Sequence, residues 1–229
     1  MLRPCRSDPP DVPQHVVLRG TNRVPCFALV EARFDYLENL RTAALRNHCA
    51  VHAYVLMDNH VHLLATPSEL GAVARMVQML HCRHREHSSG LHRCGRVRWE
   101  GHYESRPVNA ETDLLRRQRY IELNPVRAWA VGEPCAYRWS SHGANAHGDE
   151  DALLTPHPVY MRLGVSDVSR RAAYRALFTE DLSDSDHGRL RVHPKQRVRA
   201  RRCIPDLREA RTRAVRALAR GASAAAECR

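Results

Sequence analysis

The stretch that decides the fold reads Met57-Asp58-Asn59-His60-Val61-His62-Leu63-Leu64. Apolar residues on both sides of the Asp-Asn pair predict two strands, over about 51–57 and 60–66, joined by a tight turn. Side chains alternate along a strand, so His60 and His62 share one face while their apolar neighbours point into a core. The two rings are separated by roughly 6.5 Å of strand and could bind one cation. The alternative is that both imidazoles lie on the solvent-exposed face of a half-buried strand.

A second motif lies downstream and reads Arg119-Tyr120-Ile121-Glu122-Leu123-Asn124-Pro125-Val126-Arg127-Ala128. The residues before it predict a helix, with Asn109 as its N-cap and acidic residues in its first turn. Pro125 disfavours a helical conformation at Asn124, so we expect the helix to end there. Tyr120 and Asn124 are four residues apart and should project from the same face of the last turn. The alternative is a core tyrosine followed by an ordinary helix end.

The order of the predicted elements indicates the fold class. It runs strand 15–19, helix 34–47, hairpin 51–66, helix 70–86, loop and strand 91–106 and the tyrosine helix, with short helices within 153–163 and 169–178. This order describes an α+β protein, an antiparallel sheet with helices packed on it. We divide the chain into a loose N-terminus (1–11), a catalytic domain (12–130), a helical C-terminal extension (131–187) and an arginine-rich tail (188–229) that we expect to be poorly ordered.

The positive charge of the chain is concentrated at its C-terminus. The 229 residues carry a net charge of +11, and +10 of it comes from residue 188 onward, where 13 basic residues face 3 acidic ones. Such a tail should bind phosphates without sequence preference and with a strong dependence on salt. The rest of the chain is nearly neutral, so a groove for a polyanion there requires a local arrangement of charge.

Three further features of the sequence concern the compartment. We find no apolar run of the length of a membrane span and no signal-peptide core. The eight cysteines show no paired spacing. We therefore expect a reduced cytoplasmic protein.

Several motifs follow one another in an order that characterises a known family. They are Gln14-His15-Val16-Val17-Leu18-Arg19-Gly20-Thr21-Asn22-Arg23, the hairpin His52 to His62, Trp99-Glu100-Gly101, the tyrosine motif and Tyr137-Arg138-Trp139-Ser140-Ser141. Over about residues 12–178 the chain resembles the REP-associated tyrosine transposases, a branch of the single-tyrosine HUH transposase superfamily. The resemblance implies the ferredoxin-like palm of HUH nucleases, which agrees with the predicted α+β class.

The resemblance also implies a site and a reaction. It makes Tyr120 the nucleophile, His60 and His62 the ligands of a divalent ion (Mg²⁺ or Mn²⁺), and Asn124 the third ligand. The implied activity is transposase and endonuclease cleavage of single-stranded DNA, at hairpin (REP-like) sequences, through a 5′-phosphotyrosine link and a free 3′-hydroxyl. The protein would act as a monomer or homodimer, without a membrane partner. We expect DNA contacts from Arg19, Asn22, Arg23, Trp99 and Arg106.

The residue types suit this chemistry. Tyrosine has a pKa near ~10, so little phenolate exists at neutral pH and attack on a phosphodiester needs help at the phosphate. A divalent ion can polarise that phosphate and orient it. Two imidazoles and an amide oxygen leave room for phosphate and water, and such a mixed set suits Mn²⁺ as well as Mg²⁺.

Two alternatives to an active transposase stay open. One is a decayed or domesticated relative that binds DNA hairpins without cutting them, since Trp129 stands where a glycine commonly follows the tyrosine motif. The other is an unrelated metal-dependent phosphodiester hydrolase that uses the same histidines with water as its nucleophile. A covalent adduct between Tyr120 and DNA would separate the transposase from both.

Overall fold

The structure is a computed structural model that describes residues 9–27, 29–91, 99–100, 103–108 and 111–179. The predicted tail (188–229), most of the predicted loose N-terminus and the predicted N-cap Asn109 lie outside the described residues. The rest of the predicted catalytic domain and of the C-terminal extension can be compared with the expectations above.

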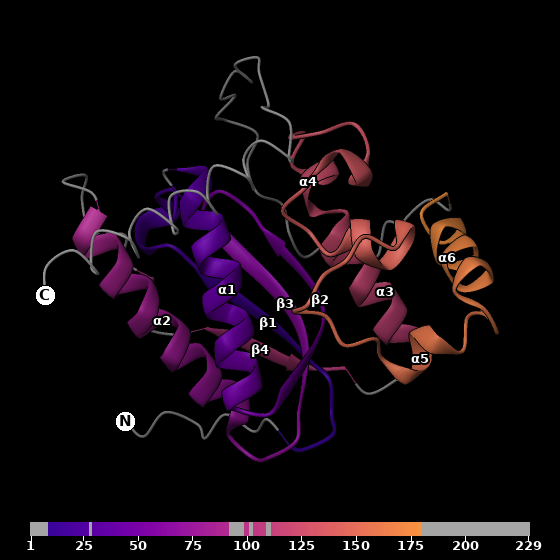
Figure 1. The fold of residues 1–229 in the computed structure, drawn as a ribbon, viewed down its shortest axis with the longest axis horizontal. Helices are drawn as coiled ribbons and strands as arrows, with labels where there is room; N and C mark the ends of the chain where they lie inside the picture. Colours follow the sequence, from indigo (N-terminus) through magenta and orange to yellow (C-terminus); the bar gives the residue numbers. More distant parts are fainter. Residues whose placement is uncertain (1–8, 28, 92–98, 101–102, 109–110, 180–229) are drawn as a thin grey trace, which may run out of the picture. The chain divides into compact units, whose positions relative to one another are not determined.

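A four-stranded antiparallel sheet in the order β2-β3-β1-β4 confirms the predicted α+β class (Figure 1). Its strands are β1 (Gln14–Arg19), β2 (Cys49–Leu56), β3 (His60–Pro67) and β4 (Glu104–Pro107). β2 and β3 form the predicted hairpin, and the Met57 N–H donates to the His60 carbonyl across its turn (2.9 Å). Next to this hairpin, β1 places Arg19 opposite His60 and Val17 opposite His62.

Two helices, α1 (Val30–Arg46) and α2 (Ala72–Leu91), cover one face of the sheet (Figure 1). The buried side chains that meet there include Val16, Leu18, Tyr36, Leu40, Val61, Leu63, Met76 and Leu80. Each large apolar side chain buried in this way stabilises the fold by about 1.5–3 kcal/mol. Because alternate residues of β3 fill this face, His60 and His62 must lie on the opposite one, as predicted.

The helix α3 (Glu111–Glu122) packs on that opposite face, where Leu114, Tyr120 and Ile121 meet Val55 and Leu64. α3 ends at Glu122, two residues before the predicted end. We expected the chain to leave the helical conformation at Asn124, before Pro125, but it does not. It breaks at Leu123 and starts a second helix, α4 (Asn124–Arg127), because proline is accepted in the first turn of a helix.

The segment after α4 covers the edge of β2. The Leu56 N–H donates to the Trp139 carbonyl (2.8 Å), and the Thr155 N–H donates to the Val51 carbonyl (2.7 Å), so backbone groups of an edge strand are paired. The two predicted short helices are α5 (Pro158–Met161) and α6 (Asp167–Ala176). These helices pack together and against α3 through a third apolar cluster, which includes Leu115 of α3. In this cluster the rings of Tyr160 and Tyr174 lie 5.2 Å apart.

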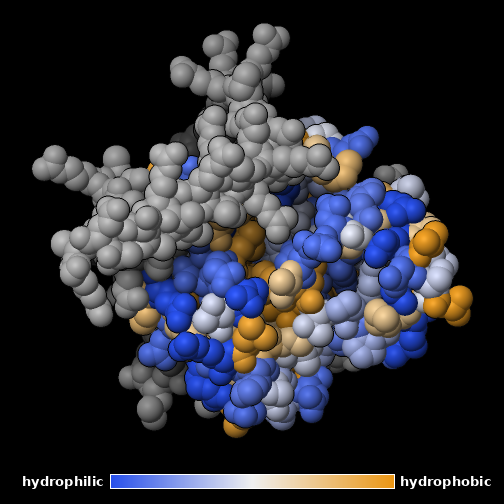
Figure 2. All heavy atoms as spheres, in the orientation of Figure 1, coloured by the Kyte–Doolittle hydropathy of each residue, from blue (hydrophilic) through white to orange (hydrophobic). Residues whose placement is uncertain are grey.

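The surface that Figure 2 draws is largely hydrophilic, and the described cysteines are unpaired, as the sequence led us to expect. Figure 2 shows hydrophilic residues over much of one face, with hydrophobic residues exposed between them near its centre. None of the described helices combines the length and the apolar character that a membrane crossing requires. The four cysteines in the described part of the chain, Cys26, Cys49, Cys82 and Cys135, are free thiols.

Candidate active site

The two histidines of β3 meet on the α3 face of the sheet. The centroids of the His60 and His62 rings are 5.0 Å apart, and the ring planes are nearly perpendicular (82°). The Nδ1 atom of His60 lies 2.7 Å from the Asn59 amide oxygen, which can only accept, so His60 donates there and keeps the lone pair of Nε2. His62 is almost fully buried, at 2% exposure.

A third imidazole, which the sequence analysis did not single out, supports the pair. His15 of β1 stacks on His62 with a centroid distance of 5.2 Å, and its Nε2 atom lies 3.0 Å from Nδ1 of His62. One of these two nitrogens must carry the proton that joins them. If Nδ1 of His62 carries it, the Nε2 lone pair of His62 is available to a cation.

Tyr120 brings its phenol to the same place from α3. Its ring centroid lies 6.0 Å from that of His62 and 5.9 Å from that of His15, both in edge-on contact. The side chain is 7% exposed and contributes to the apolar cluster under α3. The structure therefore joins the two motifs that the sequence singled out. It also shows that Tyr120 is a core residue and a neighbour of the histidines at once, so the two alternatives for this residue do not exclude each other.

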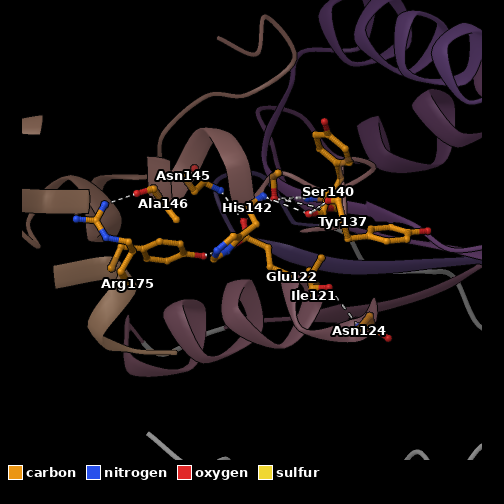
Figure 3. Close-up of polar contacts among 12 residues, drawn as sticks. Ile121, Glu122, Asn124, Tyr137, Ser140, His142, Asn145, Ala146 and Arg175 are labelled. Carbon is orange, nitrogen blue, oxygen red and sulfur yellow. Dashed lines mark hydrogen bonds and ion pairs between the residues drawn. The ribbon is translucent and has the colours of Figure 1, made fainter. Parts of the chain in front are cut away.

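Asn124 lies at the start of α4, beside His60. Its amide nitrogen donates to the Tyr120 carbonyl (3.0 Å), which fixes the amide one turn after the tyrosine. Figure 3 shows the side-chain oxygen directed away from α3. Burial, followed by the charge of Arg19, lowers the pKa of His60 to about 4, and the nearby amide of Asn124 opposes this shift.

Burial also keeps the other two imidazoles neutral. It lowers the pKa of His15 to about 3 and the pKa of His62 well below its ordinary value. The three rings are therefore uncharged at neutral pH. A neutral imidazole has one nitrogen lone pair, which is the form that binds metal ions.

Arg127 contacts the ring of Tyr120 itself. The guanidinium carbon of Arg127 lies 4.6 Å from the centroid of the Tyr120 ring, in a cation–π contact. Arg127 belongs to α4 and follows Tyr120 by seven residues. A guanidinium in this position can favour negative charge on the phenol oxygen or bind a phosphate oxygen next to it.

Of the five residues expected to contact DNA, Arg19 and Arg106 lie beside this cluster. Arg19 is opposite His60 and Arg106 is opposite His15 in the register of the sheet. The Arg106 side chain is 62% exposed and that of Arg19 is 30% exposed. Glu104 lies between them, 3.6 Å from Arg19 and 3.9 Å from Arg106, and reduces their net charge.

The other three expected contacts lie elsewhere. Asn22 and Arg23 form an exposed turn, η1 (Thr21–Arg23), and the Asn59 amide ties this turn to the histidine hairpin by donating to the Arg23 carbonyl (3.2 Å). Trp99 is buried at 9% exposure in the core under α1 and α2, where its ring stacks on His81 at 5.6 Å. Its ring therefore contributes to the core, and its contact with DNA stays a prediction.

A buried carboxylate holds the end of α3 in place (Figure 3). Glu122 is fully buried, and four side chains contact its two oxygens. They are Ser141 (2.6 Å), His142 (3.1 Å), Asn145 (2.8 Å) and Tyr174 (2.9 Å). All four come from the C-terminal extension. The segment after residue 131 therefore positions the helix turn that carries Tyr120.

A family model described as "Transposase IS200 like" matches residues 10–124, which is half of the chain and contains both histidines and the tyrosine motif. The chain belongs to the IS200-like transposase family. The match ends at Asn124, so Glu122 lies inside the matched region and its four partners in the C-terminal extension lie outside it.

The solved structures that match the chain include two described as transposases. One is a REP-associated tyrosine transposase bound to a REP hairpin, with a TM-score of 0.50 and 16% identity, over 69% of this chain and 93% of that one. The other is a candidate transposase from Deinococcus radiodurans R1, with a TM-score of 0.36 and 24% identity, over 48% of this chain and 88% of that one. The first supports the fold of this transposase. No curated protein matches the chain.

The residues at the site fit a divalent ion with a small set of protein ligands. Within the described residues, no three His, Cys, Asp or Glu side chains are arranged to hold a metal ion. His15 does not complete such a set, because its ring nitrogen faces His62. The set that fits consists of two neutral imidazoles, His60 and His62, and the amide oxygen of Asn124, which is a hard ligand of the kind Mg²⁺ and Mn²⁺ accept.

Proposed function

We propose that the protein is a metal-dependent single-strand DNA transposase and endonuclease that cuts and joins DNA through Tyr120, at hairpin sequences. The observation that carries this proposal is the packing of the Tyr120 phenol against His62, 6.0 Å between ring centroids, in one site built by β3 and α3. A nucleophile and two candidate metal ligands in such proximity suit phosphoryl transfer. The likeness to a transposase bound to a hairpin supports hairpin DNA as the substrate.

In the proposed reaction, the phenol oxygen of Tyr120 attacks the phosphorus of a phosphodiester. A bond from this oxygen to phosphorus forms, the bond from phosphorus to the 3′-oxygen breaks, the phenol loses its proton and the 3′-oxygen gains one. The products are a 5′-phosphotyrosine and a 3′-hydroxyl. Since the new ester keeps the energy of the broken one, a second 3′-hydroxyl can reverse the step and join strands.

Each residue at the site has a distinct part in this proposal. His60, His62 and Asn124 would hold a divalent ion, which would neutralise charge on the scissile phosphate and orient it. Arg127, over the Tyr120 ring, stabilises the phenolate that develops when the proton leaves. Arg19 and Arg106 attract the strand to the sheet face that bears the histidines.

His15 is expected to set the proton position of His62. With phenylalanine in its place, Nδ1 of His62 loses its partner, so we expect Mn²⁺ affinity to fall by about 10- to 100-fold. His15→Gln should keep most of the affinity, because its amide oxygen can accept the same proton. Calorimetric titration with Mn²⁺ measures both variants, and melting of the metal-free proteins controls for folding. Equal affinity of His15→Phe and wild type would contradict this role.

The proposed function is tested by cutting of end-labelled DNA with Mg²⁺ or Mn²⁺. We expect a hairpin with an unpaired flank to be cut at least about tenfold faster than a full duplex of the same sequence, because the phenol must approach the phosphate in line. Addition of a chelator should stop the reaction. Equal rates on both substrates would contradict the proposal.

The same assay separates the two other candidates. Metal-dependent cutting that persists in Tyr120→Phe would favour a hydrolase with water as its nucleophile. Hairpin binding without any cutting would favour a relative that has lost the reaction. The neutral imidazoles and the phenol at contact distance argue for retained chemistry.

A further inference from the structure

Trp129 is unusual among the tryptophans of this chain. The sequence contains three, and the other two, Trp99 and Trp139, are 9% and 8% exposed. The side chain of Trp129 is 91% exposed. Single exposed apolar residues are common, but an indole leaves an especially large apolar area in water, on the order of 200 Å². The Trp129 side chain therefore buries almost no area that could stabilise the fold.

The backbone at Trp129 is also unfavourable. The Trp129 N–H donates to the Val126 carbonyl (3.0 Å) and the Ala130 N–H donates to the Pro125 carbonyl (2.9 Å). This pair of hydrogen bonds is the Schellman motif, which ends a helix with a left-handed residue and favours glycine there. Trp129 occupies that position with φ +57°.

The other described non-glycine residues with positive φ carry polar or charged side chains; they are Asp11, Asn22, Arg23 and His48. A bulky apolar residue in this conformation is an outlier. Strain of this kind is concentrated at functional sites, where a gain in function offsets the loss of stability. An exposed ring on a strained turn therefore points to a role in binding.

The turn lies next to the groups that would handle a phosphate. Trp129 follows Arg127 by two residues, a distance of at most about 7 Å along the backbone. The Arg127 guanidinium in turn lies 4.6 Å from the ring centre of Tyr120. Figure 1 shows that α4 continues directly from the end of α3, so this turn closes the helical segment that carries the tyrosine. The indole is thus within reach of nucleotides that flank a phosphate at Tyr120.

We propose that Trp129 is a stacking site for an unpaired nucleobase of the DNA strand held at Tyr120. The indole is uncharged, flat and 91% exposed, and it follows by two residues an arginine that can bind a phosphate oxygen. A base and a phosphate, the two parts of a nucleotide, would suit this pair. Every base has a π face, so the site selects unpaired over paired bases and has little preference for sequence. This inference rests on the proposed function, because it places the strand by the Tyr120 phosphate.

Fluorescence tests the site in metal-free protein, where the strand stays intact. Since the other two indoles are buried, DNA that stacks on Trp129 should quench the solvent-sensitive part of the emission. We expect quenching by an unpaired oligo-dA strand but not by a duplex. Trp129→Gly should lose the quenching and bind the strand about tenfold more weakly or worse, with an unchanged or higher melting temperature. Trp129→Phe should keep most of the affinity, because a phenyl ring also stacks.

The outcomes separate this inference from the proposed function. Tyr120→Phe should show the same quenching as wild type. If wild-type protein shows the quenching but forms no tyrosine adduct, the stacking site is supported while the proposed function fails. An adduct in wild type, together with equal strand affinity in Trp129→Gly, would overturn the stacking site alone. The emission of Trp129 is also measured without DNA at several protein concentrations. If it becomes less sensitive to solvent as the concentration rises, Trp129 contacts a second copy of the chain, and the stacking site is overturned as well.

Discussion

His62→Ala is expected to abolish metal-dependent cutting and to reduce Mn²⁺ affinity by more than the ~10- to 100-fold expected for a supporting residue such as His15. The His62 ring contacts both the His60 ring and the Tyr120 ring, and it supplies one of two imidazole nitrogens to the proposed ion. With one imidazole and one amide oxygen left, few protein ligands remain. His60→Ala should have an effect of the same order. Calorimetry with Mn²⁺ and the cutting assay measure both losses.

A matched control for these variants is His147→Ala, which removes an exposed imidazole from the C-terminal extension. It should cut DNA and bind Mn²⁺ as wild type does. Melting of the metal-free proteins shows whether the variants fold. Wild-type Mn²⁺ affinity in both His60→Ala and His62→Ala, in proteins that melt normally, would remove the metal assignment.

The largest effect on stability is expected at Glu122. Glu122→Ala should lower the free energy of unfolding by about 3–5 kcal/mol, because it leaves the buried partners of a carboxylate without their acceptor. These partners join α3 to the C-terminal extension. Since Tyr120 lies two residues from Glu122 on α3, cutting should fall even under conditions in which the variant is folded. Urea unfolding, at fixed protein concentration, measures the loss.

Two further variants on α3 serve as comparisons for Glu122→Ala. Glu122→Gln keeps the shape and one acceptor oxygen, so its loss should be smaller than that of alanine. Glu111→Ala removes an exposed carboxylate that pairs with Arg162, and exposed pairs contribute little. A change at Glu122→Ala no greater than that at Glu111→Ala would show that the buried network does not hold the helix.

Local patterns in the sequence were enough to predict the parts of the site that depend on strand and helix periods. The alternation of β3 placed His60 and His62 together, and the four-residue spacing placed Asn124 one turn after Tyr120. Both follow from the geometry of one element. The helix α4, which contains Pro125, was missed, because the sequence indicates where α3 ends but not that a new helix starts directly afterwards.

The residues that the sequence could not reveal depend on how elements pack. His15 becomes a partner of His62 only through the register of β1 on β3. Glu122 looks like an ordinary helix carboxylate until the extension brings four partners to it. The motif that contains Trp99 does not show that its ring packs in the core against His81 and Tyr36.

The central claim, that Tyr120 attacks the DNA, is tested most directly by mapping a covalent adduct. Wild-type protein is incubated with hairpin DNA, an unpaired flank and Mn²⁺, then denatured, digested and analysed by mass spectrometry. We expect a nucleotide on the peptide that contains Tyr120, no adduct in Tyr120→Phe, and a normal adduct in Tyr54→Phe, whose hydroxyl donates to Asp151 instead. Metal-dependent cutting without any adduct, or an adduct that persists in Tyr120→Phe, would contradict the account.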